Sequence, residues 1–256
     1  MIVIRSAQEI EKIRKCNRIV AEVLGLLKNE ISAGVTTKHL DQLAEKKIRE
    51  LGALPAFKGY RNYPATICAS VNEVVVHGIP NSKRKLRNGD IISIDLGVYC
   101  DGYYGDAAGT FPIGSVSDKA ERLMAVTREA LFIGIGKAVA GNYLYEISQA
   151  IQEYVEGNGF SVVRDFVGHG IGTELHEEPQ VPNFKPDGNG MGPVLKKGMV
   201  LAIEPMVNMG KHDIKVLGDN WTAVTLDGKL SAHFEHTIAV TEGEADILSL
   251  ASLLRT

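Results

Sequence analysis

One segment of this 256-residue chain occurs twice: residues 86–95 read LRNGDIISID, and residues 195–204 read LKKGMVLAIE. The two copies align without a gap, and each leads from a glycine turn through an apolar strand to a carboxylate, Asp95 or Glu204. A shorter motif, His-Gly-Ile, recurs at residues 77–79 and 169–171. A repeat of half a chain is too long for a solenoid, so the pattern predicts two related halves that share one sheet around a pseudo-twofold axis.

The order of predicted elements supports the duplication, because in each half two helices precede the strands. In the first half, helices are predicted over 7–29 and from Thr36 or Thr37 to Gly52, and strands over 66–76, 90–99 and 105–111. In the second half, helices begin after Ser117 and Asn142, and strands follow near 161–167, 199–208, 221–226 and 231–241. We therefore expect an α+β fold in one domain, residues 1–256, with halves of about 1–112 and 113–256.

The composition is that of a globular protein and excludes several classes. Apolar residues make up 45% of the chain and charged residues 23%, unlike disordered chains, collagen or coiled coils. The formal net charge of −3 offers no basic excess for nucleic acid or an anionic membrane, and no apolar run is long enough to span a bilayer. The three cysteines lack a CxxC spacing, so we expect neither a disulfide framework nor a thiolate zinc site, and a cytoplasmic location.

Asp95 and Glu204 end the two apolar strands of the repeat. Burial of a carboxylate without a partner is strongly unfavourable, so each residue needs a compensating charge. Because the two carboxylates hold equivalent positions, they should face each other across the axis with a cation between them. Asp101-Gly102 is typical of a two-residue hairpin turn. Such a turn pairs Asp95 with Ala108 and places Asp106 on the same face.

The second half supplies the remaining candidate ligands. Glu235 follows the last turn at the position that mirrors Asp106, and His169 lies in the repeated His-Gly-Ile motif. The candidate metal ligands are Asp95, Asp106, His169, Glu204 and Glu235. Five ligands are more than the three protein ligands that a catalytic zinc usually has. Because most of the donor atoms are oxygens, the set suits two divalent ions (Co, Mn, Fe or Zn) with bridging carboxylates. The alternative to a metal site is that Asp95 forms an ion pair with an arginine or lysine and that Glu235 is exposed to solvent.

Two further histidines are candidates for contact with a substrate. His77 follows an apolar strand and His176 ends the glycine-rich segment 168–176, and for each a purely structural role is the alternative. The other histidines have no comparable context and are expected to be structural or exposed: His39, His212, His233 and His236. We interpret Cys68 as a small apolar residue in the wall of a pocket and not as a nucleophile.

Several segments together resemble the type I methionine aminopeptidases. They are residues 60–64 (YRNYP), 70–80 (SVNEVVVHGIP), 95–97 (DLG), 168–172 (GHGIG) and 203–205 (IEP). The resemblance covers essentially the whole chain and implies the pita-bread fold, in which two pseudo-symmetric ααββ halves surround a central antiparallel sheet. It implies a single catalytic domain that removes the initiator methionine from nascent proteins and peptides, preferentially before a small second residue, through a hydroxide bridged between two divalent metals.

The resemblance also implies roles for individual residues. It assigns the metals to the five ligands named above, substrate binding and catalysis to His77 and His176, and proton transfer to Glu204. The implied methionine pocket consists of Tyr60, Tyr63, Cys68, Leu175 and Trp221, with Phe57 at its edge. Leu175 stands where close relatives often carry phenylalanine. A monovalent cation is implied near Asn72, Val74 and Ser231.

Other functions compatible with these residues stay open. One is an Xaa-Pro peptidase of the same fold, although such enzymes usually carry an extra N-terminal domain. Another is a metal-free peptide-binding relative, which would have lost ligands that this sequence retains. A two-metal phosphoesterase would need more cationic groups than the motifs offer. The expected partners are peptides and nascent chains with N-terminal methionine, and the ribosome; we expect a monomer without membrane or specific nucleic-acid partners.

Overall fold

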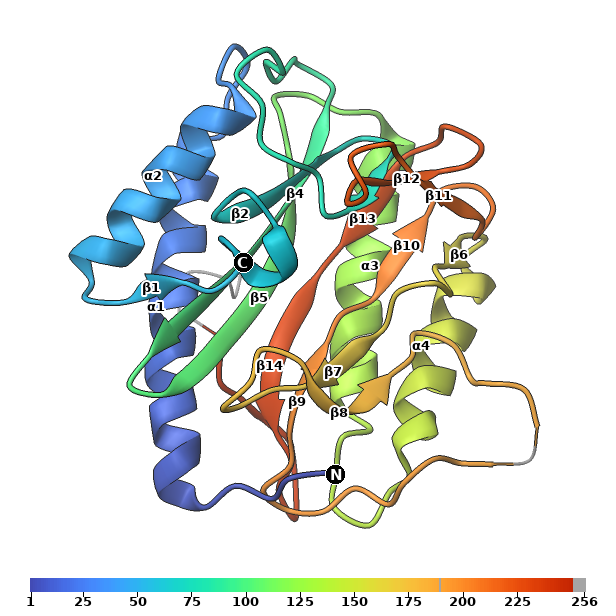
Figure 1. Cartoon of the computed structure of the whole chain (residues 1–256). Coiled ribbons are helices and arrows are strands. Elements are labelled where there is room, and N and C mark those ends of the chain that lie inside the picture. The colour runs from blue at the N-terminus through green and yellow to red at the C-terminus, as the bar shows by residue number, and fades with distance from the viewer. Residues whose placement is uncertain (189, 251–256) are drawn as a thin grey trace.

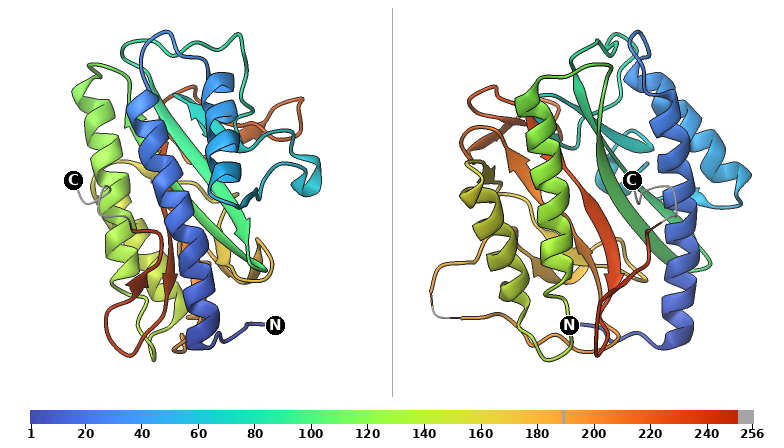
Figure 2. Two further views of the ribbon diagram at one scale, coloured as in Figure 1. Left: turned by 90° about the vertical axis from the view of Figure 1, so that its left-hand side faces the viewer. Right: turned by 180° about the vertical axis from the view of Figure 1, so that it is seen from behind.

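The computed structural model of the chain describes residues 1–188 and 190–250. It forms two main layers, with helices on one face of a central sheet (Figure 1). The right-hand view of Figure 2 shows α1, α3 and α4 across the face that points away from the viewer in Figure 1, with α2 beside α1. The helices are α1 (Ala7–Glu30), α2 (Thr37–Glu50), α3 (Asp118–Ile135) and α4 (Leu144–Gly157), with a 3-10 turn, η1, at Tyr60–Asn62.

The central sheet has nine strands within the described residues and is antiparallel throughout. Its order is β1-β4-β5-β14-β9-β7-β8, and β2 also pairs with β4 and β15 with β14. The strands are β1 (Leu54–Pro55), β2 (Ile67–Val71), β4 (Ile91–Cys100), β5 (Tyr103–Pro112), β7 (Gly168–Gly170), β8 (Glu177–Val181), β9 (Val200–Ile203), β14 (Glu235–Ala239) and β15 (Asp246–Ile247).

Two smaller antiparallel sheets complete the described fold. One has the order β13-β10-β6, and the other β11-β12-β3. Their strands are β3 (Val74–Val76), β6 (Ser161–Val162), β10 (Met206–Asn208), β11 (Ile214–Val216), β12 (Ala223–Thr225) and β13 (Ser231–His233). The second sheet combines β3 of the first half with β11 and β12 of the second, so the two halves are interlocked here as well.

The two copies of the repeat become β4 and β9, and the halves join where β5 pairs with β14. At that junction Glu235 lies opposite Ala108, and His236 lies opposite Ala107. The shared sheet that the duplication predicts is therefore confirmed. The hairpin register is confirmed too, because Cys100 pairs with Tyr103 and Asp95 with Ala108.

Each half has an apolar core between its helices and the sheet. In the first half, Leu24 of α1 and Leu40 of α2 belong to the same buried cluster as Ile92 and Leu96 of β4. In the second half, the equivalent cluster contains Leu123, Ile147, Leu201 and Ile238. Each fully buried side chain of this kind stabilises the fold by about 1.5–3 kcal/mol. The helices thereby hold one face of the sheet rigid and leave the opposite face free for a site.

The predicted helices form, with one difference at a helix start. Ser6 and Glu9 make the capping box of α1, and Thr36 caps α2. We expected Asn142 to cap the next helix of the second half, but α4 begins one residue later, with Tyr143 as its N-cap. The side chain of Asn142 donates instead to Lys137 O, and Glu146 accepts from the backbone N–H of Tyr143.

Several predicted strands are shorter than expected or divided. The segment 66–76 splits into β2 and β3, because Asn72 between them has a left-handed backbone, with φ 57°. The segments 199–208 and 231–241 likewise divide, at Glu204-Pro205 and at Phe234. Of 161–167, only Ser161–Val162 is strand. Strands β1, β7, β8, β11 and β15 were not predicted.

We expected no disulfide framework from the sequence and did not foresee a single disulfide, which the structure contains. Cys16 of α1 and Cys100 at the end of β4 form a disulfide, with their Cα atoms 5.9 Å apart. The two residues are 84 positions apart in a sequence without a recognisable motif, and they meet only because α1 packs across the β4–β5 hairpin. Cys68 is free and buried. None of the described helices combines the length and apolar character of a bilayer-spanning helix.

Candidate metal centre and substrate cavity

Asp95 and Asp106 lie on the face of the sheet that carries no helices. Asp95 is opposite Ala108 and Asp106 is opposite Gly97, so the two carboxylates are diagonal neighbours on adjacent strands. The backbone N–H of Asp106 donates to Asn17 Oδ1 of α1 at 3.2 Å. Gly105 permits this approach, since a Cβ at that position would lie 2.7 Å from Asn17 N. Helix α1 therefore fixes the strand position that aims Asp106 into the site.

The second half contributes His169, Glu204 and Glu235 from β7, the end of β9, and β14. Glu235 is opposite Ala108, which places it in line with Asp95 across β5. His169 Nδ1 lies 2.9 Å from Gly170 O, and a carbonyl can only accept, so Nδ1 carries the proton. The lone pair of His169 Nε2 is then free, and this atom lies 3.5 Å from Glu204 Oε1.

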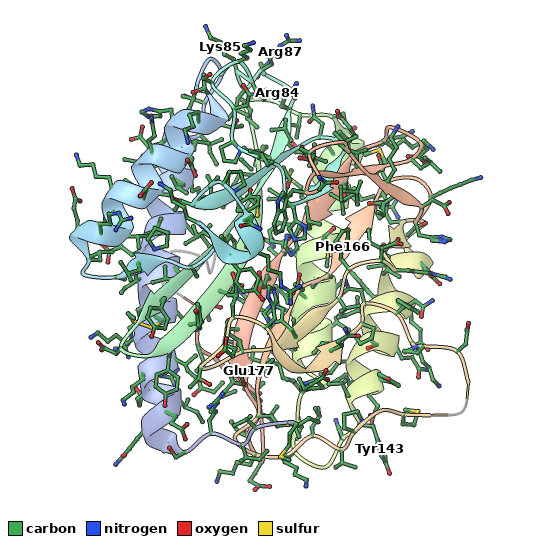
Figure 3. The ribbon with its side chains drawn as sticks, viewed as in Figure 1. Arg84, Lys85, Arg87, Tyr143, Phe166 and Glu177 are labelled. Carbon is green, nitrogen blue, oxygen red and sulfur yellow. A yellow bond between two sulfur atoms is a disulfide. The ribbon has the colours of Figure 1, made fainter. Side chains whose placement is uncertain are left out.

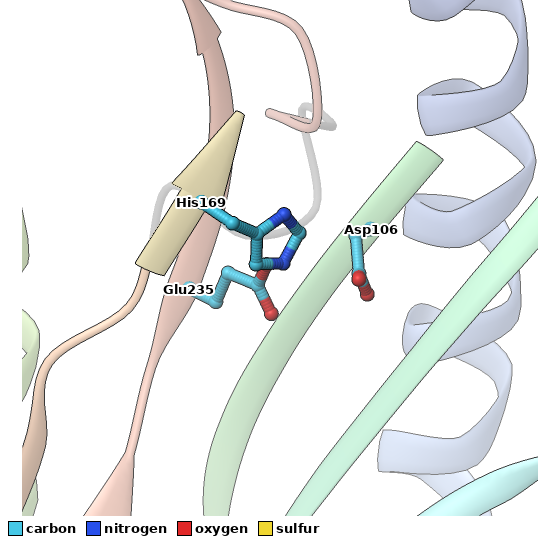
Figure 4. A group of neighbouring side chains, drawn as sticks. All are labelled: Asp106, His169 and Glu235. Atoms are coloured by element: carbon cyan, nitrogen blue, oxygen red, sulfur yellow. The ribbon is translucent and has the colours of Figure 1, made fainter. Parts of the chain in front are cut away.

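The arrangement fits a cation. Asp106, His169 and Glu235 each present one donor atom, and these atoms lie within 4.8 Å of one another (Figure 4). Over residues 1–188 and 190–250, buried oxygens of Asp95, Asp106 and Glu235 have no hydrogen-bond partner. Within the same residues, no lysine or arginine pairs with the five candidates, and the recorded ion-pair distances reach only Glu204, from histidines. Buried carboxylates without donors are unfavourable when ionised, and a positive ion held by these residues would compensate their charge.

The electrostatics of the protein alone oppose ionisation of these acids. Burial raises the pKa of Asp95 to about 7, with a further upward contribution from Glu204. Burial raises the pKa of Glu204 to about 8, and it also raises the pKa values of Asp106 and Glu235, whose carboxylates repel each other. Burial lowers the pKa of His169 to about 3, which keeps its imidazole neutral. Bound divalent cations would lower the pKa values of these carboxyl groups and so favour their ionised form. A neutral imidazole can bind such a cation directly.

A cavity of about 530 Å³ opens over this cluster. The five candidate ligands line it together with all the residues of the implied pocket and both substrate histidines: Phe57, Tyr60, Tyr63, Cys68, His77, Leu175, His176 and Trp221. Cys68 of β2 pairs with Asp95 of β4, so the apolar wall and the carboxylates are joined through one pair of strands. The structure thus brings together every site residue that the sequence predicted. Leu175 is 1% exposed and keeps this part of the wall apolar.

The two histidines that line the cavity are held differently. His176 Nδ1 lies 2.7 Å from the Tyr60 hydroxyl, and its ring packs edge-on against His169 with ring centroids 4.3 Å apart. His77 has a left-handed backbone, with φ 59°, which is uncommon for a residue with a side chain. Its ring contacts Trp221 and Phe166 edge-on. Burial lowers the pKa of His77 to about 4, so this imidazole is neutral at pH 7.

The predicted site did not include Phe166, which lines the cavity, or His233, which lies beside Glu204. Phe166, labelled in Figure 3, has its ring centroid 5.2 Å from that of His77 and lines the cavity, but nothing in its sequence context distinguishes it from a core residue. His233, which we expected to be structural or exposed, has its Nε2 atom 3.6 Å from Glu204 Oε2. The sequence does contain a signal for His233: it lies two residues before Glu235, and in the continuous strand predicted over 231–241 the two side chains would share a face.

The residues of the implied monovalent site lie near one another at the junction of the halves. Ser231 N donates to Asn72 O at 2.9 Å, and Ser231 Oγ donates to Val207 O at 3.2 Å. Asn72 precedes β3, which begins at Val74. The Asn72 side chain bonds Asp90 and the backbone N–H of Ile91, which fixes the turn.

Known proteins share both the sequence and the fold. The profile of metallopeptidase family M24 matches residues 11–242. The sequence is 53% identical to a methionine aminopeptidase of Clostridium perfringens over 251 residues, which are 98% of this chain and 99% of that protein. It is also 53% identical to methionine aminopeptidase 1 of Bacillus subtilis over 249 residues, 97% of this chain and 99% of the relative.

Solved structures agree with the sequence comparison. The crystal structure of a methionine aminopeptidase from Thermotoga maritima superposes with a TM-score of 0.95 at 46% identity, over 98% of this chain and 100% of that one. A prolidase from Pyrococcus furiosus gives a TM-score of 0.80 at 24% identity, over 98% of this chain and 66% of the prolidase. The prolidase likeness concerns the fold alone.

Proposed function

The chain belongs to metallopeptidase family M24, and from this membership we propose that it is a metal-dependent methionine aminopeptidase with the pita-bread fold. Its reaction is the removal of N-terminal methionine from peptides and nascent proteins. The observation that carries the proposal is the convergence of four carboxylates and one imidazole, from both halves of the repeat, beneath a cavity with an apolar wall. The metal would act on the peptide bond while the wall selects the side chain.

Two divalent ions are part of the proposal, and Mn, Fe, Co and Zn are all compatible with the donors. The ions would be held by Asp95, Asp106, His169, Glu204 and Glu235. When bound, such ions polarise a carbonyl and lower the pKa of water, which supplies a nucleophile at neutral pH. Four carboxylates match the charge of two divalent ions, which explains why so many acids are tolerated in one buried cluster.

The wall formed by Tyr63, Cys68, Leu175 and Trp221 supports selection of methionine. Tyr63 packs edge-on against Trp221 with ring centroids 5.0 Å apart, and both Cys68 and Leu175 are buried. An unbranched thioether fits an apolar pocket of this kind, since it loses little on leaving water. Phe57 and Tyr60 complete the lining. A small second residue of the substrate is preferred because bulk there would collide with the rim.

Glu204 is the proposed proton carrier. It lines the cavity together with the other proposed ligands, within reach of a water molecule that bound ions would activate, and a carboxylate in that place can accept and release a proton. It would accept the proton of the attacking water and pass it to the leaving amine. This role is additional to its place among the metal ligands.

His176 and His77 are proposed to contact the scissile peptide. If the Tyr60 hydroxyl donates to Nδ1 of a neutral His176, the remaining ring proton lies on Nε2 and can be donated to the developing oxyanion. His77, neutral and held between Trp221 and Phe166, would contact the substrate amide near the leaving nitrogen.

Further features extend the proposal. A monovalent cation near Asn72, Val74 and Ser231 would support the turn beside β3. We also propose that the protein is a cytoplasmic monomer that acts at the ribosome, where nascent chains with N-terminal methionine emerge. The exposed side chains of Arg84, Lys85 and Arg87 project together from one end of the molecule (Figure 3) and offer positive charge toward an RNA-rich surface.

A peptide assay tests the proposed function. Metal-loaded protein should release free methionine from Met-Ala-Ser, as followed by mass spectrometry, and chelated protein should not. A matched Xaa-Pro peptide should remain intact. Cleavage of the Xaa-Pro peptide alone would identify an Xaa-Pro peptidase, and loss of both activities with metal bound would favour a binding protein.

A further inference from the structure

His233 is a buried histidine beside Glu204 that the proposed mechanism leaves unused. Its side chain is 2% exposed, and its Nε2 atom has no hydrogen-bond partner among residues 1–188 and 190–250. A buried polar atom without a partner is unfavourable and rare in native proteins, so this one needs an explanation. The carboxylate within ion-pair distance is that of Glu204, whose Oε2 lies 3.6 Å away, and the charge of Asp95 also acts on the imidazole.

The backbone of His233 is fixed by the half of the protein that carries Asp95. Its N–H donates to Thr110 Oγ1 at 2.9 Å, and that hydroxyl donates to the carbonyl of His233 at 2.8 Å. Because the only hydroxyl proton of Thr110 is then used, Ser93 Oγ must donate to Thr110 Oγ1, from which it is 2.8 Å away. Ser93 lies on β4 two residues before Asp95. The position of the imidazole is therefore tied to the strands that carry the metal ligands.

Glu204 stands between two imidazoles that differ in what they can offer. His169 Nε2 approaches Oε1, but its proton is on Nδ1, so this nitrogen has only a lone pair and serves an ion. His233 Nε2 approaches Oε2 and has no other acceptor within the described residues. A carboxylate that binds metal usually receives a hydrogen bond on its other oxygen, and this second contact fixes its orientation.

We propose that His233 is a positioning residue, whose Nε2–H donates to Glu204 Oε2 in the metal-loaded protein and so fixes the carboxylate that binds metal and moves the proton. This inference rests on the proposed function. The present separation of 3.6 Å is slightly beyond hydrogen-bond reach, and a small rotation of either side chain closes it. The geometry distinguishes His233 from a core histidine, which would have its ring nitrogens satisfied within the core.

Two substitutions at His233 and one control test the assignment. His233→Gln retains an N–H donor near the position of Nε2, whereas His233→Leu removes the donor and keeps the volume. His236→Leu is the matched control, because His236 is also buried and lies on the opposite face of the same chain segment, where its Nδ1 bonds Ser249. Thermal unfolding of each chelated variant first shows that it is folded.

The readouts are the dissociation constant for Mn²⁺ by titration calorimetry, and kcat and KM for Met-Ala-Ser. His233→Leu should bind Mn²⁺ about 10- to 100-fold more weakly and lose kcat more than it changes KM, as expected when an outer partner of a ligand is removed. His233→Gln should stay within about threefold of the unmodified protein, since it restores the donor. His236→Leu should bind Mn²⁺ like the unmodified protein.

Two results would overturn the inference. One is unchanged Mn²⁺ affinity and kcat in His233→Leu. The other is an equal loss in His233→Gln and His233→Leu with both proteins folded, because that pattern would mean that the imidazole itself binds the metal or is needed only for packing. Failure of the proposed function is separate: the unmodified protein would then bind Mn²⁺ but release no methionine, and the calorimetric comparison would still decide the role of His233.

Discussion

Removal of one hydroxyl group tests how the oxyanion donor is held. Tyr60 Oη lies 2.7 Å from His176 Nδ1, and the two rings pack with centroids 5.1 Å apart and planes at 45°. The substitution Tyr60→Phe removes the hydrogen bond but keeps the ring, so the apolar wall of the cavity stays in place. Any change in catalysis then reports on the orientation and tautomer of His176.

The hydrogen bond sets the size of the expected effect. A neutral hydrogen bond contributes about 0.5–1.5 kcal/mol, which corresponds to a fall of about 2- to 13-fold in kcat for Met-Ala-Ser. KM should change less, because the hydroxyl acts on a donor that matters most in the transition state and the aromatic wall is retained. Steady-state kinetics of the metal-loaded protein provides both constants.

A double-mutant cycle with His176→Ala decides between a direct and an indirect role of the hydroxyl. If Tyr60 acts through His176, Tyr60→Phe should have no further effect on kcat once the imidazole is absent. The reasoning is refuted if Tyr60→Phe alone has no effect on kcat, or if it has the same effect with and without His176.

Three other predictions concern the same site. Glu204→Gln should retain the fold, as judged by circular dichroism, but lose most turnover of Met-Ala-Ser; near-normal turnover would remove Glu204 from proton transfer. Leu175→Ala should lower the free energy of unfolding by about 2–5 kcal/mol in urea titration and raise KM for the methionine peptide, while an unchanged KM would place methionine elsewhere. The chelated protein should lose stability as pH rises, because burial raises the folded-state pKa of Asp95 to about 7 and of Glu204 to about 8, above their ordinary values. A raised carboxyl pKa stabilises the folded state fully below the unfolded pKa, and this contribution is lost as pH rises through the folded pKa, so the melting temperature should fall between about pH 5 and pH 8. Saturating Mn²⁺ should remove this fall in calorimetry, and a flat profile without metal would contradict the electrostatic argument.

The duplication and the hairpin were readable from the sequence because both rest on local rules. Equivalent apolar strands placed Asp95 and Glu204 at matching positions, and the two-residue turn determined the pairing of Asp95 with Ala108, which the structure has. The substrate cavity was expected from a resemblance in motif order rather than from such rules. Its lining residues come from segments far apart in the chain and meet only in the folded protein.

The parts that were missed depend on tertiary contacts or on backbone conformation. The disulfide between Cys16 and Cys100 forms because a helix crosses a hairpin, and no spacing in the sequence indicates that crossing. The long strand patterns were divided because Asn72 adopts a left-handed backbone and Pro205 cannot continue a ladder of hydrogen bonds. His233 was overlooked because its meaning depends on Glu204, which approaches it from a different strand.

The central claim is that two divalent ions join the halves of the repeat through their carboxylates. Anomalous X-ray diffraction from crystals grown with Mn²⁺ tests it most directly. We expect two anomalous peaks inside the cavity, in contact with the side chains of Asp95, Asp106, His169, Glu204 and Glu235. A cavity without an anomalous peak, with these carboxylates turned away from one another, would contradict the account.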